Sequence, residues 1–315
     1  MSERLALTID IGGTQSRVAL IDGRSQIIKR ASVPTESREG HKVVIEEIRK
    51  LVSQREFGRV AGIGISIAGL LKLDTGTLVY SPNMPGWVNV PIKQIFSDEF
   101  HLPVYVSNDA SLAALGEHRY GAAKGLDNFI YITVSTGIGG GMVLDGRLYL
   151  GADGYAGEVG HMTIDPDGPV CSCGMRGCFE AMASGTAIAR DAKERIAACT
   201  TSMISEMVGG DLEKITAATV EQAARQGDGL AKDLMYQAAV NLGIGLSSLI
   251  IIFNPDAVVV GGGVTKSNEL IFEPARKVVA KRAVCYLRRD VPILKAVLKD
   301  NVGLIGAAAM VFDNV

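Results

Sequence analysis

The chain has 315 residues, of which 47% are hydrophobic, and its formal net charge is −2. This length predicts two domains, and this apolar content is enough for a sizeable core in each of them. The near-neutral charge disfavours a dedicated nucleic-acid binder, because such proteins usually carry a basic face.

Strands and helices are predicted to alternate along the chain. Apolar and β-branched runs predict strands at residues 5–9, 17–21, 27–33, 60–67, 104–106, 129–134, 141–144 and 257–260. Helical spacing of apolar residues predicts helices at residues 39–55, 110–120, 186–198, 230–253 and 303–312. This alternation predicts an α/β protein with largely buried sheets.

A strand–turn–strand pattern occurs twice, at residues 7–20 and 130–143, which predicts two related lobes facing one another across a cleft. Two ordinary hairpins in a glycine-rich chain are the alternative. The first lobe is predicted to comprise residues 1–117 and 303–315, and the second residues 118–302. The N-terminus has no signal peptide, and no segment reaches the roughly 18 apolar residues of a membrane span. We therefore expect a cytoplasmic protein with no membrane partner.

The first glycine-rich turn, Asp10-Ile-Gly12-Gly13-Thr14, follows the first strand directly. Glycine lets backbone amides approach a phosphate closely, and Thr14 adds a hydroxyl donor. Asp10 could hold Mg²⁺ directly or through water. A plain hairpin turn is the alternative, because Gly-Gly pairs are common in such turns. The motif thus predicts a phosphate site that needs support from elsewhere in the chain.

Two further glycine-rich strand ends supply that support. One contains Thr136 and Gly137, and the other is the run Gly261, Gly262 and Gly263. The first of these would complete a two-sided clamp on a polyphosphate, and the second could let an adenine or ribose lie flat on the backbone. Neither a Walker A loop nor a Rossmann fingerprint is present, because no Gly-Lys-Ser/Thr follows and the next segment reads as a strand.

Asp109 stands where a predicted strand meets a helix rich in alanine and leucine. One interpretation is a helix N-cap, which suits aspartate. The other is a general base that accepts a hydroxyl proton during phosphoryl transfer. The two roles are compatible, since a helix N-terminus also stabilises a carboxylate.

One histidine and three cysteines have the spacing of a zinc site: His161, Cys171, Cys173 and Cys178. One imidazole and three thiolates make a closed tetrahedral set, so the Zn²⁺ would be structural. Buried free cysteines beside an unrelated histidine are the alternative. Cys199 and Cys285 lie in apolar surroundings, which is typical of core cysteines.

Glu158 and Glu180 each lie within three residues of a predicted zinc ligand. Rigidly held carboxylates can accept hydrogen bonds from sugar hydroxyls, as can the amides of Asn83 and Asn108. The alternative is that both glutamates are solvated loop acids.

In this order the motifs resemble the ROK family (repressors, open reading frames and sugar kinases) of the hexokinase–actin superfamily. The resemblance spans nearly the whole chain and is carried by Asp10–Thr14, Ser81-Pro-Asn83, Asn108-Asp109, Thr136–Gly140, Glu158-Val-Gly-His161 and Cys171–Glu180. It implies a two-lobed actin-like ATPase (ribonuclease H-like) fold with MgATP and a sugar in the cleft between the lobes.

The resemblance also implies roles for single residues. Asp109 would be the catalytic base for the sugar 6-hydroxyl. The sugar-binding residues would be Asn83, Asn108, Asp109, Glu158, His161 and Glu180. His161 would serve both the zinc and the sugar, because the metal fixes the tautomer and orientation of its ring. Family members commonly form dimers, so a homodimer is expected.

The sequence departs from many relatives at Gln15, where they carry Lys or Asn after the Gly-Gly-Thr. Gln can donate to a phosphate oxygen but adds no charge. The segment Ser81–Trp87, with Glu158, His161 and Glu180, resembles the glucokinase branch, so we expect glucose as substrate. Kinases of N-acetylmannosamine and N-acetylglucosamine in the same family are alternatives.

Two further alternatives belong to other functional classes. A sugar-sensing repressor would carry a DNA-binding extension, whereas the first glycine turn here ends by residue 14. A sugar-binding protein without catalysis is disfavoured by the presence of Asp109. We therefore expect a kinase that takes ATP and a hexose and has no nucleic-acid partner.

Overall fold

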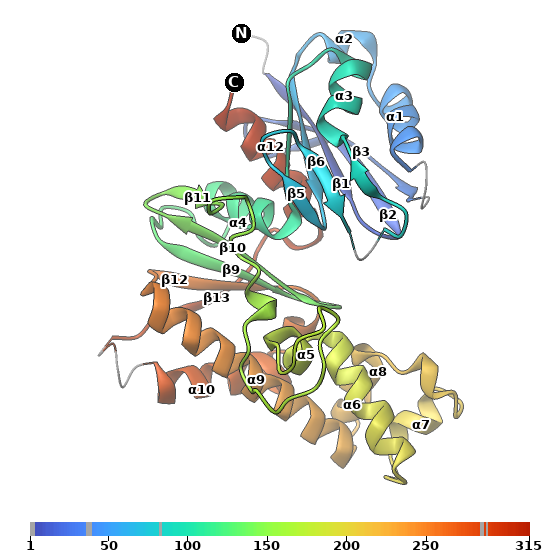
Figure 1. Ribbon diagram of the computed structural model, residues 1–315, viewed down its shortest axis with the longest axis vertical. Coiled ribbons are helices and arrows are strands. Elements are labelled where there is room, and N and C mark those ends of the chain that lie inside the picture. Colours follow the sequence, from blue (N-terminus) through green and yellow to red (C-terminus); the bar gives the residue numbers. More distant parts are fainter. Residues whose placement is uncertain (1–3, 36–39, 82–83, 284–286, 288) are drawn as a thin grey trace. The chain divides into compact units, whose positions relative to one another are not determined.

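The computed structural model describes residues 4–35, 40–81, 84–283, 287 and 289–315, and Figure 1 shows their α/β architecture. The chain divides into two compact units. The first comprises Met1–Tyr131, Gly141–Gly157 and Ala296–Val315, and the second Ile132–Gly140 and Glu158–Lys295.

The strands are β1 (Leu5–Ile11), β2 (Gln15–Asp22), β3 (Ile27–Pro34), β4 (Val60–Ile67), β5 (Leu70–Lys72), β6 (Thr77–Tyr80), β7 (Val88–Val90), β8 (Val104–Asn108), β9 (Phe129–Val134), β10 (Ile138–Leu144), β11 (Arg147–Tyr149), β12 (Ala257–Gly261) and β13 (Ile293–Lys295). The α-helices are α1 (Gly40–Leu51), α2 (Gln54–Phe57), α3 (Ile92–Phe100), α4 (Asp109–Tyr120), α5 (Phe179–Ala183), α6 (Gly185–Ala197), α7 (Met203–Met207), α8 (Ala217–Arg225), α9 (Gly229–Phe253), α10 (Glu273–Arg282) and α12 (Val302–Asp313). Short 3₁₀ or π turns occur at η1 (Val159–His161), η2 (Leu212–Lys214), η3 (Val264–Lys266), η4 (Asn268–Phe272) and η5 (Lys299–Asn301).

Two five-stranded sheets share one strand order. The first runs β3-β2-β1-β4-β8 and the second β11-β10-β9-β12-β13. If the five strands of each sheet are counted in chain order, both sheets have the spatial order 3-2-1-4-5. In the first sheet β2 runs antiparallel to its two neighbours β1 and β3, whereas β4 and β8 run parallel to β1. This common order agrees with the repeated strand–turn–strand pattern of the sequence.

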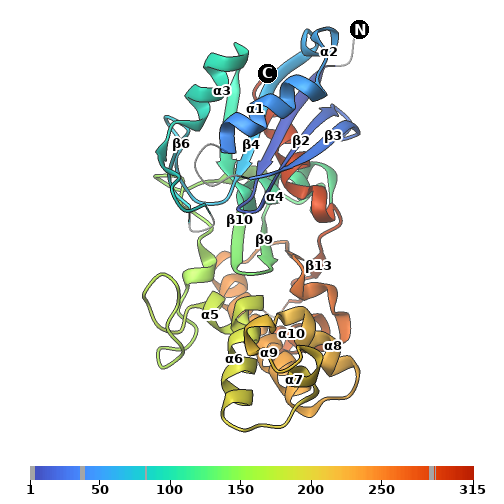
Figure 2. The ribbon, with the colours of Figure 1, turned by 90° about the vertical axis from the view of Figure 1, so that its right-hand side faces the viewer.

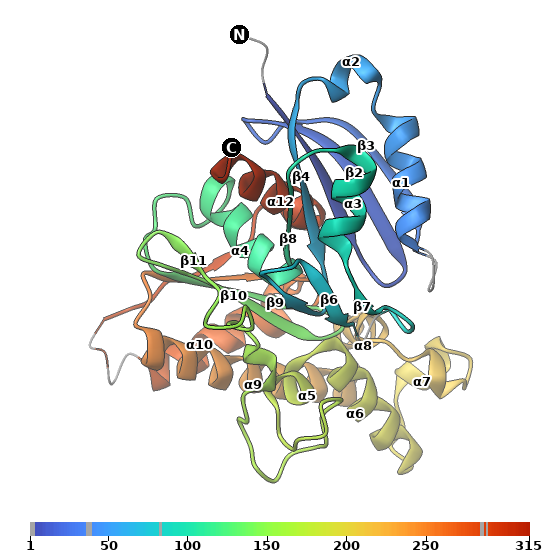
Figure 3. The ribbon, with the colours of Figure 1, turned by 45° about the horizontal axis from the view of Figure 1, so that its top comes forward.

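The first sheet is covered by helices on both faces, as Figures 1 and 3 show. Side chains alternate along β1, so Leu7 and Ile9 pack with α1 and α3, and Ala6 packs with α12. Because both faces are covered, β1 is apolar along most of its length, as buried strands require.

The crossing of α4 and α12 depends on glycine. A Cβ atom on Gly306 would lie 1.9 Å from the carbonyl oxygen of Leu112. We expect Gly306→Ala to lower the free energy of unfolding by about 1–3 kcal/mol or more, because the helices must separate. Gly229→Ala is the control, since a Cβ there meets nothing within 4 Å. Denaturant titration of both variants measures the difference, and equal stabilities would contradict the prediction.

In the second unit α9 is the central helix and contacts α5, α6, α8 and α10 (Figure 2). A Cβ on Gly245 would lie 2.5 Å from the ring of Phe179, so glycine is what allows α5 to pack this closely. By length and hydropathy α9 could cross a membrane, contrary to the prediction that no segment is apolar enough for a span. Half of its most apolar window is buried against other elements, as in a core helix of a globular domain.

The structure differs from the sequence prediction in several places. The helix predicted over residues 39–55 is divided, because Ser53 caps α2 and forms a capping box with Glu56. The small sheet β5-β6-β7 and helix α3 were not predicted. Residues 118–131, 141–157 and 296–302 belong to the first unit rather than the second. In the segment 141–157, the β10 backbone at Gly141 packs directly on α4.

Candidate functional site

Asp10 is held at the end of β1 by its sheet neighbours. The register places Arg17 and Ser66 opposite Asp10 on the two adjoining strands. The Ser66 hydroxyl donates to Asp10 Oδ1 at 2.9 Å, and the guanidinium of Arg17 lies 3.6 Å from Oδ2. Burial raises the pKa of Asp10, and Ser66 and Arg17 oppose that rise. The register of β1 and β2 is what places Arg17 beside Asp10.

The turn after Asp10 exposes its backbone. Gly13, Thr14 and Gln15 are all exposed, and the turn is closed by a hydrogen bond from the Gly12 amide to the Gln15 carbonyl at 3.1 Å. A second bond runs from the Thr35 amide to the Thr14 carbonyl. The turn can therefore offer amides and a hydroxyl to an anion without losing its own fixed shape.

Asn108 and Asp109 mark the junction of β8 and α4. Asn108, not Asp109, is the N-cap, and its Oδ1 accepts from the amides of Ala110 and Ser111. Asp109 is the first helical residue, half-buried, and its Oδ1 also accepts from the Ala110 amide, at 2.8 Å. The positive end of α4 favours its ionised form. Asn83 lies outside the described residues.

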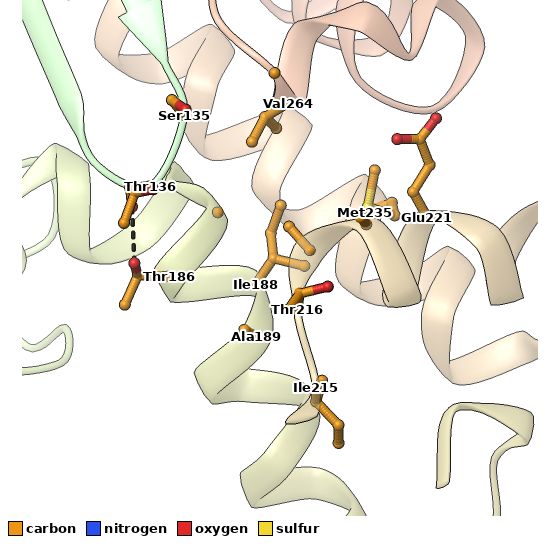
Figure 4. A pocket seen from close by; sticks show the side chains of 14 residues that line it. Ser135, Thr136, Thr186, Ile188, Ala189, Ile215, Thr216, Glu221, Met235 and Val264 are labelled. Carbon is orange, nitrogen blue, oxygen red and sulfur yellow. Dashed lines mark hydrogen bonds between the residues drawn. The ribbon is translucent and has the colours of Figure 1, made fainter. Parts of the chain in front are cut away.

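The second unit brings the other two glycine-rich strand ends together at one cavity of about 440 Å³, shown in Figure 4. Thr136 belongs to the turn between β9 and β10, and its carbonyl accepts from the Thr186 hydroxyl at 2.8 Å. Gly263 lines the same cavity. A Cβ on Gly262 would lie 2.2 Å from the Val134 carbonyl, so glycine permits β12 to end against β9.

Helices α6, α8 and α9 supply the rest of this cavity. Its lining is mostly apolar and includes Ile188, Ala218 and Met235, with Glu221 at its edge (Figure 4). A flat apolar wall with a few polar groups suits a nucleotide base. Sequence reasoning missed these residues, because isolated apolar positions on helices look the same in a core as in a binding site.

The four predicted zinc ligands converge. The ligand atoms of His161, Cys171, Cys173 and Cys178 all lie within 4.8 Å of one another. The Sγ atoms of Cys173 and Cys178 are 3.6 Å apart, and Cys171 Sγ lies 3.7 Å from His161 Nδ1. In a tetrahedral site with Zn–S bonds of about 2.3 Å, neighbouring ligand atoms lie about 3.8 Å apart. The number, type and spacing of these ligand atoms are compatible with a tetrahedral Zn²⁺ site.

The loop that carries the thiols is shaped by glycine and by burial. Gly177 has φ +65°, and a Cβ there would lie 1.4 Å from the Asp165 carbonyl oxygen, so no other residue fits.

Burial and the neighbouring thiols raise the pKa of Cys178 to about 12. Ionisation of Cys178 at neutral pH would therefore require a cation beside it, whereas a hydrogen bond from the backbone at Met175 lowers the pKa of Cys173.

Glu158 precedes the three cysteines in the sequence and Glu180 follows them, and the two carboxylates contact different groups. Glu158 Oε2 is 4.0 Å from His161 Nε2, the ring nitrogen that faces away from Cys171. Glu180 Oε2 accepts from the Ile138 amide at 2.8 Å and lies against Gly137. Glu180 thus joins the thiol loop to the turn that carries Thr136, a link that the sequence did not predict.

Residues 6–314 match the ROK family along almost the entire chain. The chain belongs to the ROK family. This ROK protein is 34% identical to the glucokinase of Thermotoga maritima, over 98% of this chain and 97% of that protein. It is also 35% identical to a putative xylose repressor of Caldicellulosiruptor, over 92% of this chain and 72% of that protein.

A solved relative is the ROK family glucokinase from Streptomyces griseus in complex with glucose and AMPPNP. It shares 35% identity with this ROK protein and a TM-score of 0.83, over 98% of this chain and 100% of that chain. The predicted family and the predicted α/β fold of the actin-like ATPase class are therefore confirmed. The roles of the single site residues remain predictions.

Proposed function

We propose that this ROK protein is an ATP-dependent glucokinase that phosphorylates the 6-hydroxyl of glucose. The observation that carries the proposal is the full-length likeness to glucokinases, one of which binds glucose and AMPPNP. The cavity at Thr136 and Gly263 and the intact Asp109 support it from the chain's own residues.

Asp109 is proposed as the general base. Its carboxylate accepts the proton of the sugar hydroxyl while the hydroxyl oxygen bonds to the γ-phosphorus of ATP. The bond from that phosphorus to the bridging oxygen breaks, and ADP leaves. Most of the acceleration then comes from positioning and charge stabilisation, because no covalent intermediate with the protein is formed.

The sugar ring is proposed to bind Asn83, Asn108, Glu158, His161 and Glu180. The distance of 4.0 Å between His161 and Glu158 supports a shared ligand, since one hydroxyl can bond to both. The bond between Glu180 and Ile138 fixes that carboxylate in one orientation, which favours selective recognition.

The glycine-rich turns are proposed to bind ATP. The exposed residues Gly13, Thr14 and Gln15, in the turn that the Gly12 amide closes, and the turn at Thr136 and Gly137 are proposed to offer amides and hydroxyls to the phosphates. Gly261, Gly262 and Gly263 are proposed to lie against the nucleoside. Asp10 would hold Mg²⁺, whose charge offsets that of the phosphates.

Ser66→Ala is expected to move the acid side of the pH–rate profile to higher pH. Burial already raises the pKa of Asp10, and the Ser66 hydrogen bond is the main contact that lowers it. Without that bond the pKa rises further, so the ionised carboxylate is lost at a higher pH as the pH falls. The measurement is kcat/KM for MgATP as a function of pH.

Thr8→Val is the control for this experiment. Thr8 lies two residues before Asp10 on β1, but its hydroxyl donates to the Ala19 carbonyl instead. Its acid limb should match that of the wild type. An acid limb in Ser66→Ala that also matches the wild type would contradict the role given to Asp10.

His161, Cys171, Cys173 and Cys178 are proposed to hold a structural Zn²⁺. Their mutual distances support this, as does the absence of any position left for a reactive water in a four-ligand set. The metal would cross-link the loop that carries the cysteines, and this loop would in turn orient His161 and Glu180.

The experiment that tests the function is ADP release on a panel of glucose, mannose, N-acetylglucosamine and N-acetylmannosamine. Glucose is expected to give the highest kcat/KM. A preference for an amino sugar would move the protein to another branch of the family, and activity on none of the four would contradict the kinase proposal.

A sugar-responsive regulator is the second candidate, favoured by the identity to the xylose repressor. We propose that this protein has no nucleic-acid partner, so a gel shift with operator DNA should show no retention with or without sugar. We also propose a cytoplasmic location, which the free state of the described cysteines supports.

A homodimer is proposed as the oligomeric state. Two adjoining exposed apolar side chains at the C-terminal end of α9, Ile251 at 41% and Ile252 at 66% exposure, support a protein contact there. Light scattering should give twice the chain mass of 33.3 kDa, and a mass of one chain would contradict the proposal.

A further inference from the structure

The cavity of about 440 Å³ in the second unit has a single charged side chain among the described residues that line it. This residue is Glu221, which lies on α8 and whose side chain is 26% exposed. Figure 4 shows Glu221 on the opposite side of the cavity from Thr136. With the phosphates of a nucleotide at the Thr136 turn, its base would therefore reach the side where Glu221 stands.

Arg225 fixes the carboxylate of Glu221 from the next turn of α8. Its Nε and Nη2 atoms both donate to Glu221 Oε1, at 3.1 and 2.8 Å. Nη2 also donates, at 3.1 Å, to the hydroxyl of Ser267, a fully buried residue. Ser267 belongs to the segment that follows Gly263, and Gly263 lines the same cavity. Arg225 thus holds the carboxylate in place relative to the glycine-rich end of β12.

The second oxygen of this carboxylate is available to a ligand. Glu221 Oε2 accepts no hydrogen bond within the described part of the chain, because both bonds from Arg225 go to Oε1. A carboxylate accepts hydrogen bonds and donates none, so the partner of Oε2 has to be a donor. The Thr216 hydroxyl beside it is occupied, since it caps α8 and accepts from the Thr219 amide at 3.2 Å.

The other walls of the cavity suit a flat aromatic base. Ile188, Met235 and Val264 line it and are buried. The 6-amino group of adenine is a donor, whereas the 6-oxo group of hypoxanthine or guanine is an acceptor. Guanine also has two adjacent donors, which match a carboxylate with both oxygens free. A carboxylate with one free oxygen instead matches the single amino group of adenine.

We propose that Glu221 selects adenine over 6-oxopurines by accepting a hydrogen bond from the 6-amino group at Oε2, and that Arg225 is its positioning residue. This inference rests on the proposed binding of ATP at this cavity. A 6-oxopurine would place its carbonyl oxygen against the carboxylate. Two acceptors would then face one another, and neither would regain the hydrogen bond that it made to water.

The test is calorimetric titration of the full-length protein with MgADP and with MgIDP, its hypoxanthine analogue, in the absence of sugar. The wild type is expected to bind ADP at least about tenfold more tightly than IDP. Glu221→Gln should lower this ratio by at least about tenfold. Arg225 would hold the amide oxygen, so the amide NH₂ would take the place of Oε2 and donate to the 6-oxo group of IDP.

Arg225→Met tests the positioning role separately. It should lower the ratio of ADP to IDP affinity by about threefold or more, because nothing then fixes the carboxylate of Glu221. Arg225→Lys, which keeps a cationic donor, should recover part of the ratio. A wild-type ratio in Arg225→Met would remove Arg225 from this role.

Glu194→Gln is the matched control for Glu221→Gln. Glu194 lies on α6, another helix of the cavity, and its carboxylate is 3.9 Å from Arg190, but it is 70% exposed and does not line the cavity. Its ratio of ADP to IDP affinity should stay within about twofold of the wild-type ratio.

Two results would overturn the role of Glu221 and leave nucleotide binding intact. One is equal affinity of the wild type for ADP and IDP, or an unchanged ratio in Glu221→Gln. The other is a Glu221→Gln variant that binds ADP more weakly but binds 2′-deoxy-ADP like the wild type, because the carboxylate would then bind the ribose. A wild type that binds neither ADP nor IDP would overturn the proposed kinase function as well.

Discussion

Asp109→Asn is expected to reduce turnover by about 10²–10⁴-fold while sugar affinity stays within about tenfold. The amide cannot take the hydroxyl proton, but it keeps nearly the same shape. Its oxygen can still accept from the Ala110 amide, and the cap of α4 is made by Asn108. Steady-state kinetics with glucose and MgATP, together with equilibrium glucose binding, measure the two effects separately.

Asp228→Asn is the matched control for that substitution. Asp228 caps α9, where it accepts from the amides of Ala231 and Met203. Its replacement should cost about 1–3 kcal/mol of stability, because an amide has one acceptor oxygen where both carboxylate oxygens are used, and should leave turnover within about twofold. If Asp109→Asn turned over at the wild-type rate, Asp109 would not be the base, whereas equal losses in both variants would indicate a defect of folding.

Cys178→Ser is expected to abolish zinc binding and to reduce phosphorylation at sub-saturating glucose by at least about tenfold. The Cys178 thiol lies 3.6 Å from that of Cys173, and Glu180 follows two residues later at the start of α5. Without the cross-link made by the metal, His161 and Glu180 would no longer be held in fixed orientations. Zinc content by elemental analysis and the KM for glucose measure the two effects.

Cys199→Ser controls for the loss of a thiol as such. Cys199 is free and exposed, so its prediction as a core cysteine is wrong, and it lies outside the predicted metal set. This variant should therefore keep its zinc and its KM. A wild-type protein without zinc, or a Cys178→Ser variant with one zinc per chain, would refute the metal assignment. Wild-type KM in a zinc-free Cys178→Ser protein would instead separate the metal from sugar binding.

The sequence by itself determined the features that local spacing encodes. His161, Cys171, Cys173 and Cys178 could be grouped because short, glycine-containing segments bring their side chains together wherever the loop lies. The start of α4 was readable for the same reason to within one residue, although Asn108 rather than Asp109 is its N-cap, and so were the glycine-rich strand ends. The capping box of Ser53 and Glu56 was equally local and was missed.

Only the tertiary structure decided which distant residues meet. Alternation along a strand tells which side chains share a face, but the register that sets Arg17 and Ser66 beside Asp10 is a long-range pairing. The apolar lining around Met235 and the bond from Ile138 to Glu180 likewise join segments far apart in the chain. Such contacts depend on how whole helices and strands pack, and the spacing of residues along the chain does not predict that packing.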